Sequence, residues 1–237
     1  MLQIFDTGIN TADFNMRLDA LLLEELSAPT LHLYEWARPS ATYGYFTKPE
    51  NHLNLKNVEL RHLDLARRPT GGGIVFHIWD LAFSFLLPST NPAFSLNTLE
   101  NYAFVNQVVL EIVRDFFSLK DPLELIAQNG VSLGPDCQNF CMAKPTQYDV
   151  VYQGLKIAGA AQRKRKQGYL HQGTISLAYP HLDLLEDVLL SKKEVLEAMK
   201  SYTFAPLGRL WEPEELHATR RELEKLLADK LKLALTF

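Results

Sequence analysis

Cysteine is scarce in this sequence, and its scarcity excludes two kinds of protein. Only Cys137 and Cys141 occur among 237 residues. A single pair in a chain of this length is not a disulfide framework. A zinc site needs about four ligands, and no histidine-rich segment lies close to the pair, so we expect no metal site. One of the two thiols could instead be catalytic.

Long apolar runs and an overall positive charge are also missing. No apolar run approaches the ~18 residues that span a membrane, and residues 1–6 lack the basic and then apolar segments of an export signal. We therefore expect a cytoplasmic protein with no membrane partner. The formal net charge is −4, which argues against nucleic acid as a general partner.

One local cluster of positive charge departs from this balance. The sequence runs Arg163-Lys164-Arg165-Lys166 without a break. One interpretation is a solvated loop. The other is a docking site for an acidic partner, because a local patch steers encounter without altering the overall charge.

The apolar pattern predicts a mixed α/β fold. Strands are expected at residues 2–7, 31–36, 81–87 and 174–178, with a tight hairpin at 148–158 that turns at Gln153-Gly154. Residues 121–147 are expected to form an irregular loop. Strands dominate the middle of the chain and helices lie outside them, so one mixed-sheet α/β domain is predicted.

Three helices are predicted from apolar residues at helical spacing. The first follows Asn10 or Thr11 as its cap, the second covers residues 95–117, and the last begins at Pro213 with a leucine stripe. The apolar face expected for the first helix consists of Phe14, Leu18, Leu21 and Leu22.

The most informative segment is a glycine-rich loop. Arg67 and Arg68 lead into Pro69-Thr70, and three glycines then precede a strand-like run that ends at His77. Consecutive glycines let the backbone approach a ligand closely, and their N–H groups can hold an anion or a polarised carbonyl. The guanidinium groups add fixed positive charge. A ligand site is therefore favoured over a simple hairpin turn.

A thiol and a lysine form the second informative pattern. Cys141 precedes the predicted hairpin, and Lys156 lies in its second strand. An ammonium near a thiol favours the thiolate, which is the reactive form, and a partly desolvated lysine can hydrogen-bond an oxyanion. Thioester exchange followed by amine attack needs these groups and no metal. The competing interpretation is that Cys141 is a small buried hydrophobe.

Together these motifs resemble those of the superfamily of lipoate–protein ligases, octanoyltransferases and biotin–protein ligases. The resemblance rests on Arg-Arg-Pro-Thr-Gly-Gly at 67–72 and on Lys-Ile-Ala-Gly-Ala-Ala-Gln-Arg at 156–163. It implies the biotin/lipoate ligase catalytic-domain fold: α/β, with a mixed, largely antiparallel central sheet flanked by helices. That domain would cover residues 1–190, and 191–237 would be a small helical extension packed on it.

Cys141, Pro145 and Tyr148-Asp149 further resemble the cysteine-dependent octanoyltransferases. On that resemblance Cys141 would take an octanoyl group from acyl carrier protein as a thioester, without a cofactor. Lys156 would hold the acyl carbonyl. The acceptor would be the lysine of a lipoyl domain, either in a 2-oxoacid dehydrogenase complex or in the glycine cleavage H protein.

The same resemblance implies a substrate pocket and a docking surface. Arg163, Lys164, Arg165 and Lys166 would dock the acidic protein partners. The sequence departs from the family's pattern at Thr47, Ile78 and Gln172. The residues expected to bind substrate or support its pocket are Tyr43, Arg67, Arg68, Gly71, Gly72, Gly73, His77, Gly159, Gln162, Gly173 and Thr174.

Other readings stay open from the sequence. In an ATP-dependent lipoate–protein ligase, lipoate and ATP would form lipoyl-adenylate, Lys156 would hold carboxylate and phosphate oxygens with Mg²⁺ assisting, and Cys141 would be a bystander. A non-catalytic module would bind an acyl chain or a lipoyl domain without transfer. Biotin transfer is a further possibility within the superfamily.

Overall fold

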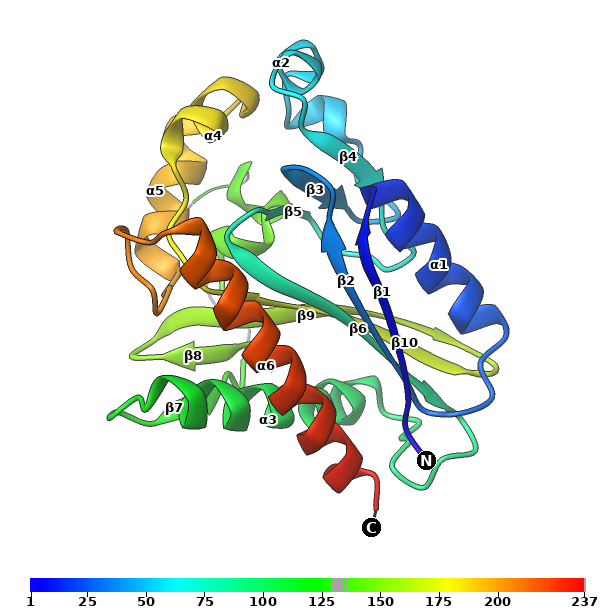
Figure 1. Ribbon diagram of the computed structural model, residues 1–237. Coiled ribbons are helices and arrows are strands. Elements are labelled where there is room, and N and C mark those ends of the chain that lie inside the picture. Colours follow the sequence, from blue (N-terminus) through cyan, green and yellow to red (C-terminus); the bar gives the residue numbers. More distant parts are fainter. Residues whose placement is uncertain (129–133, 135, 237) are drawn as a thin grey trace.

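Two β-sheets organise the computed structural model, which describes residues 1–128, 134 and 136–236 (Figure 1). The larger sheet has the order β1-β2-β6-β10-β9-β8-β7, and the smaller has the order β4-β3-β5. Among the pairs of named strands that the structure describes, only β1–β2 and β3–β4 are parallel. The predicted mixed, largely antiparallel sheet is confirmed.

The strands follow the apolar pattern of the sequence. In the larger sheet they are β1 (Gln3–Asn10), β2 (Thr30–Trp36), β6 (Asp80–Pro88), β7 (Leu123–Leu125), β8 (Val150–Tyr152), β9 (Leu155–Arg165) and β10 (Gly168–Ser176). The smaller sheet contains β3 (Ser40–Tyr43), β4 (Asp64–Arg67) and β5 (Ile74–His77). The predicted hairpin at 148–158 is confirmed, with Gln153 and Gly154 both at positive φ in its turn.

Side chains of the central strands alternate between the two faces of the larger sheet. Phe83 and Phe85 of β6 join the main core under α3 (Thr98–Phe117) and α6 (Pro213–Ala234). Ala82 and Ser84 point to the other face, toward α1 (Ala12–Glu24). Figure 1 shows α6 crossing the sheet and α1 beside β4. The predicted helices at 95–117 and from Pro213 are confirmed.

The apolar face predicted for α1 is wrong at Phe14 and Leu21, whereas Leu22 packs, partly buried, against Leu86 and Leu170. Phe14 and Leu21 are 47% and 53% exposed, whereas Asn15 and Asp19 are fully buried. The reason is hydrogen bonding: Asn15 donates to Glu35 O, and Asp19 accepts from three buried side chains described below. Hydrogen bonds of this kind offset the cost of burying polar groups, so the helix turns this polar stripe inward, although Asn15 Oδ1 has no partner among the described residues.

The remaining helices and the loop segment complete the smaller-sheet side of the molecule. α2 (Leu55–Leu60), α4 (Leu182–Val188) and α5 (Lys192–Tyr202) pack with β5 around a second core. The predicted irregular loop at 121–147 contains β7 and the 3-10 turns η2 (Asp136–Asn139) and η3 (Cys141–Ala143), and another turn, η1, covers Pro49–Asn51. Two residues that predicted this loop, Gly130 and Pro135, lie outside the described residues.

Side chains from α6 form part of the main core rather than a separate one. Leu223 and Leu227 are fully buried with Phe83 and Ile175. Arg220 donates to the backbone oxygens of Ile78 and Asp80 at 2.7 Å each. The division at residue 190 stays a prediction. No helix in the described ranges is both long and apolar enough to cross a membrane.

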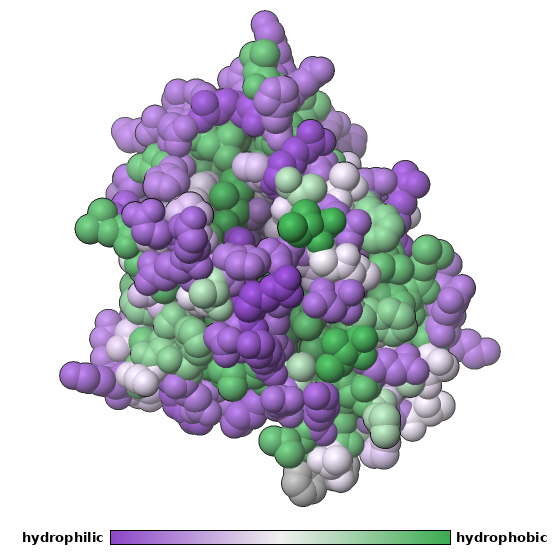
Figure 2. Space-filling model, in the orientation of Figure 1, coloured by the Kyte–Doolittle hydropathy of each residue, from purple (hydrophilic) through white to green (hydrophobic). Residues whose placement is uncertain are grey.

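The outer edge of the larger sheet carries apolar side chains. Ile4, Phe5 and Ile9 of β1 are 41%, 42% and 67% exposed. Figure 2 shows green, apolar surface in the region of β1 and α1.

A buried histidine makes the stability of this fold depend on pH. Burial lowers the pKa of His171 to about 3. The folded protein therefore keeps His171 neutral while the unfolded chain takes up a proton near pH ~6.5, so stability is lost as pH falls. Between pH ~7.5 and ~5 we expect this residue to cost about 2 kcal/mol. Urea unfolding at both pH values, compared with His171→Leu, measures it; equal pH dependence in both proteins would contradict the prediction.

Candidate active site

A cavity of about 340 Å³ lies where the glycine loop, the Cys141 segment and strands β9 and β10 meet. Its floor is the sheet face opposite to α3 and α6. Two cross-strand pairs on this floor are Gly159 with Thr174 and Ala161 with Gln172. The glycine loop and residues 138–146 form the other walls. Segments distant in sequence therefore converge on one chamber.

Cys141 and Lys156, which the sequence singled out without placing them in contact, lie next to each other at this cavity. Cys141 is half-buried and lines the cavity. Lys156 is fully buried, and its Nζ lies 3.4 Å from Cys141 Sγ and 3.0 Å from Cys141 O. A positive charge at this distance stabilises negative charge on the sulfur. The pair has the composition required for nucleophilic acyl transfer.

Asp149 holds Lys156 in its charged form. The Asp149 Oδ2 atom lies 2.7 Å from Lys156 Nζ and also accepts hydrogen bonds from Thr146 N and Thr146 Oγ1. Burial works to lower the pKa of Lys156, but the charges of Asp149 and Cys141 outweigh it and raise that pKa above its usual value. Lys156 is therefore an ammonium at neutral pH, available as a donor and not as a base.

Two positions near Cys141 require glycine, one packed on this ion pair and one packed on the segment before Cys141. A Cβ at Gly159 would lie 2.5 Å from Lys156 Cε and 2.7 Å from Asp149 Oδ1. A Cβ at Gly73 would lie 2.2 Å from Asn139 O, because the segment before Cys141 packs directly on the glycine loop. These contacts position the thiol segment against the loop.

Arg68 fixes the shape of the glycine loop. Its guanidinium is buried and donates to the backbone oxygens of Thr42, Gly71 and Gly73 at 2.8–3.0 Å. Burial lowers the pKa of Arg68 below its usual value, yet a guanidinium stays charged in proteins. Arg68 therefore stabilises the conformation of the loop through these hydrogen bonds and places a positive charge in the cavity wall.

Several polar side chains of the cavity wall are paired with one another or with buried neighbours. His77 bonds Thr42 Oγ1 at 2.8 Å through Nε2 and Asp80 Oδ2 at 2.7 Å through Nδ1, and Thr174 donates to the same Asp80 oxygen. Gln172 accepts from Thr70 Oγ1 and donates to Asp19, both at 2.6 Å. Polar groups that are already paired present little penalty to an apolar guest.

Asp19 is the centre of the second of these networks. It also accepts from His32 Nδ1 at 2.8 Å and from Ser84 Oγ at 2.6 Å. Through Gln172 and Thr70 this buried carboxylate connects α1 to the glycine loop. This explains why the inward face of α1 is polar.

The structure separates the predicted substrate-binding residues into two groups. Four of them do not line the cavity. Tyr43 packs beside the second core, and Gln162 hydrogen-bonds His171 and Tyr102 on the side of the sheet that faces α3. Gly71 and Arg67 lie outside the cavity, on or beside the loop. Those that line the cavity are Arg68, Gly72, Gly73, His77, Gly159, Gly173 and Thr174.

Sequence reasoning missed several residues of the site. Asp149 was noted only as part of a motif, although an acidic residue just before the hairpin strand that pairs with the Lys156 strand is the available signal for an ion pair. Thr42 precedes Tyr43 in the sequence and is the residue that enters the cavity. Gln172, noted only as a departure from the family pattern, connects the loop to Asp19.

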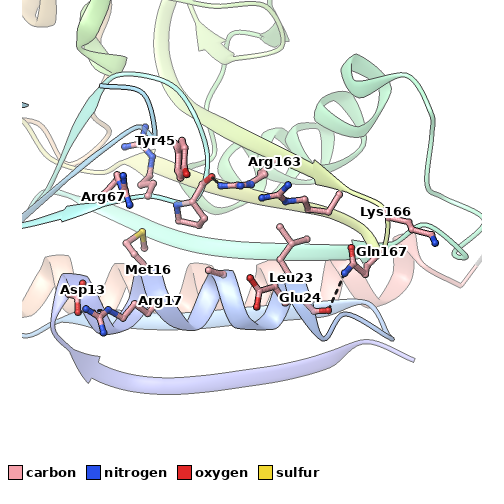
Figure 3. A pocket seen from close by; sticks show the side chains of 14 residues that line it. Asp13, Met16, Arg17, Leu23, Glu24, Tyr45, Arg67, Arg163, Lys166 and Gln167 are labelled. Carbon is pink, nitrogen blue, oxygen red and sulfur yellow. Dashed lines mark hydrogen bonds and ion pairs between the residues drawn. The ribbon is translucent and has the colours of Figure 1, made fainter. Parts of the chain in front are cut away.

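A second, larger hollow of about 650 Å³ lies outside the glycine loop, between α1 and the β9–β10 hairpin (Figure 3). We call it the basic groove. Arg163, Arg165 and Lys166 line it, together with Arg67. Lys164 instead points to the other face, where its Nζ bonds Leu96 O and lies over Phe94. The predicted basic patch is therefore the end of a β-hairpin.

No group of three or more His, Cys, Asp and Glu side chains is close enough to hold a metal ion within the part of the chain that the structure describes. A thiol beside a buried ammonium at a small cavity is typical of an acyl-transfer enzyme.

The family follows from sequence comparison. Residues 11–209 match the lipoyl protein ligase A/B catalytic domain, and the chain belongs to this family. Two curated relatives are named Octanoyltransferase LipM. The one from Halalkalibacterium halodurans is 32% identical over 79% of this chain and 68% of its own length. The one from Anoxybacillus flavithermus is 34% identical over 80% of this chain and 68% of its own length.

Solved structures agree on the fold. A bi-partite lipoate protein ligase studied with its E2 lipoyl domain, from Thermoplasma acidophilum, has a TM-score of 0.69 at 21% identity, covering 98% of this chain and 84% of that one. A lipoate-protein ligase A bound with ATP has a TM-score of 0.68 at 22% identity, covering 98% of this chain and 85% of that one.

Proposed function

We propose that this enzyme transfers an octanoyl group to the lysine of a lipoyl domain through a thioester on Cys141. The observation that carries the proposal is the contact of Lys156 Nζ with Cys141 Sγ at 3.4 Å at the cavity. The LipM names of its curated relatives support it. The ATP-dependent ligase reading has support only from the fold of its structural neighbours.

The reaction would proceed in two exchanges. The Cys141 thiolate attacks the carbonyl carbon of octanoyl-acyl carrier protein, and the carrier thiol leaves with a proton. A neutral lysine amine of the lipoyl domain then attacks the new thioester, forming an amide and restoring the Cys141 thiolate as the amine proton is lost to solvent. Lys156 donates to the acyl oxygen as negative charge develops there in each step.

The partners follow from this chemistry. Acyl carrier protein is the proposed donor, and the acceptor is a lipoyl domain of a 2-oxoacid dehydrogenase complex or the glycine cleavage H protein. The donor thioester is already activated and its conversion to an amide is downhill, so neither ATP nor Mg²⁺ is required. We place the reaction in the cytoplasm with these partners, in a catalytic unit of residues 1–190 with 191–237 packed on it.

Intact mass spectrometry after incubation with octanoyl-acyl carrier protein, without ATP, tests the proposal. We expect one octanoyl adduct that hydroxylamine removes and that Cys141→Ala lacks. Cys137→Ala is the matched control, because Cys137 is fully buried and does not line the cavity; it should keep the adduct. Acceptor labelling that occurs only with lipoate and ATP, with no adduct, would identify a ligase instead.

A further inference from the structure

The basic groove carries more positive charge than its own acidic residues balance. Arg17 pairs with Asp13 at 2.8 Å. Arg67, Arg163, Arg165 and Lys166 also line the groove. None of these four forms an ion pair with a carboxylate among the residues that the structure describes. In a chain of net charge −4, this unbalanced cluster predicts an anionic ligand.

Two of these guanidinium groups are held against one aromatic ring. Arg67 lies 4.8 Å and Arg163 4.9 Å from the ring centroid of Tyr45, so the two charges are within about 10 Å of each other. Arg163 also donates to Pro69 O at 2.7 Å. Figure 3 shows Tyr45, Arg67 and Arg163 on the side of the groove opposite to α1. Figure 3 shows Tyr45 between the two arginines, and the geometry of each guanidinium suits phosphate oxygens.

The groove and the cavity follow one face of β9. Gly159 and Ala161 line the cavity, and Arg163 and Arg165 line the groove. Alternate strand residues share a face, so these four form one row, with about 13 Å between Gly159 and Arg163. Gln162 lies on the opposite face, where its N–H bonds Tyr102 of α3. Arg68 lines both hollows.

The lining of the groove changes from apolar to charged. Met16, Ala20 and Leu23 of α1 form an apolar side, opposite to Arg163. A ligand that matches the row is an extended chain with a thiol at one end, an apolar and amide-containing middle, and a phosphate at the other end. Its thioester would reach Cys141 while its phosphate met the guanidinium pair.

We propose that the basic groove binds the phosphate end of the pantetheine arm that carries the acyl group on the donor. The inference rests on the proposed function and names the part of the donor that this surface takes: Arg67 and Arg163 hold the phosphate, and Arg165 and Lys166 attract it. The arm then lies along Ala161 toward Cys141.

Two small donors test the inference, octanoyl-pantetheine and octanoyl-pantetheine 4′-phosphate, which differ only in the phosphate. We expect the native enzyme to form the Cys141 adduct at least about tenfold faster with the phosphorylated donor. Arg67→Gln with Arg163→Gln should reduce this ratio to about one and leave the rate with octanoyl-pantetheine within about threefold. Lys56→Gln, an exposed charge change on α2, should leave the ratio unchanged.

Arg163 donates a hydrogen bond to Pro69 O in the glycine loop, so its replacement also removes a contact of that loop. A second variant separates the loss of charge from the loss of this contact. Arg165→Gln with Lys166→Gln removes two charges without that bond and should lower the ratio about threefold. Inorganic phosphate should compete only with the phosphorylated donor. Adduct formation at equal rates from both donors in the native enzyme would overturn the groove assignment alone. No adduct from either donor or from octanoyl-acyl carrier protein would overturn the proposed function with it.

Discussion

Replacing Lys156 with methionine is expected to lower octanoyl transfer about a thousandfold or more. Removal of one oxyanion donor costs about 10²–10³ in rate, and the Cys141 sulfur loses its neighbouring charge at 3.4 Å as well. Methionine keeps the length of the chain without the ammonium. The measurement is the single-turnover rate of the Cys141 adduct, followed by intact mass spectrometry with octanoyl-acyl carrier protein.

Two comparisons separate chemistry from folding in this experiment. Lys156→Met leaves Asp149 without its cation, so the variant should be combined with Asp149→Asn to restore a neutral pair. The double variant should fold and still fail to form the adduct. Lys56→Met, remote from the cavity, should react at the native rate. Adduct formation in Lys156→Met within tenfold of the native rate would show that Lys156 is not the stabilising donor.

The sequence predicted the sheet and the long helices, because each has a local signal, and it singled out Cys141 and Lys156 without showing that they lie close together. Apolar periodicity marks strands such as β6, and the Gln153-Gly154 turn fixes the hairpin that carries Lys156 back past Asp149. A two-residue turn determines its own register. Family resemblance then supplied the pairing of the glycine loop with this hairpin, which no local pattern could provide.

What the sequence could not predict are contacts between buried polar side chains. Asn15 and Asp19 lie at polar positions of α1, and periodicity alone assigns such positions to solvent. The burial of Asp19 depends on His32, Ser84 and Gln172, which arrive from other strands, and that of Asn15 depends on Glu35 O. The direction in which a side chain points at the end of a short strand is equally hard to predict from the sequence. Tyr43 and Thr42 are neighbours, and only the strand's pairing decides that Thr42 enters the cavity.

These polar networks have a consequence for the acyl site. Arg68, His77 and Gln172 give the cavity wall a charged and polar composition, yet their hydrogen bonds are made within the wall. An octanoyl chain therefore meets the flanks of paired groups, and the Lys156 ammonium, which contacts Cys141 Sγ, is the donor that we propose for the reactive carbonyl. A cavity wall of paired polar groups beside the Lys156 ammonium suits transfer of an apolar acyl group.

Loss of the Asp149 charge is expected to be the largest effect on stability. Asp149→Asn leaves the Lys156 ammonium fully buried without a counter-ion, and breaking a buried ion pair in this way costs about 3–5 kcal/mol. Urea unfolding at neutral pH measures the free energy. Asparagine can still accept from Thr146 N, so the change isolates the charge. Without the Asp149 charge the pKa of Lys156 falls. As the pH is raised, the variant should therefore lose transfer activity at a lower pH than the native enzyme does.

The matched set for this prediction is a double-mutant cycle. Asp149→Asn and Lys156→Met should each destabilise the fold, and the double variant should cost less than their sum by about 2–3 kcal/mol. That coupling identifies the pair itself as the source of the loss. A cost below about 1 kcal/mol for Asp149→Asn would place the pair among weak, solvated ion pairs. In that case Lys156 would owe its position to packing against Gly159 and not to Asp149.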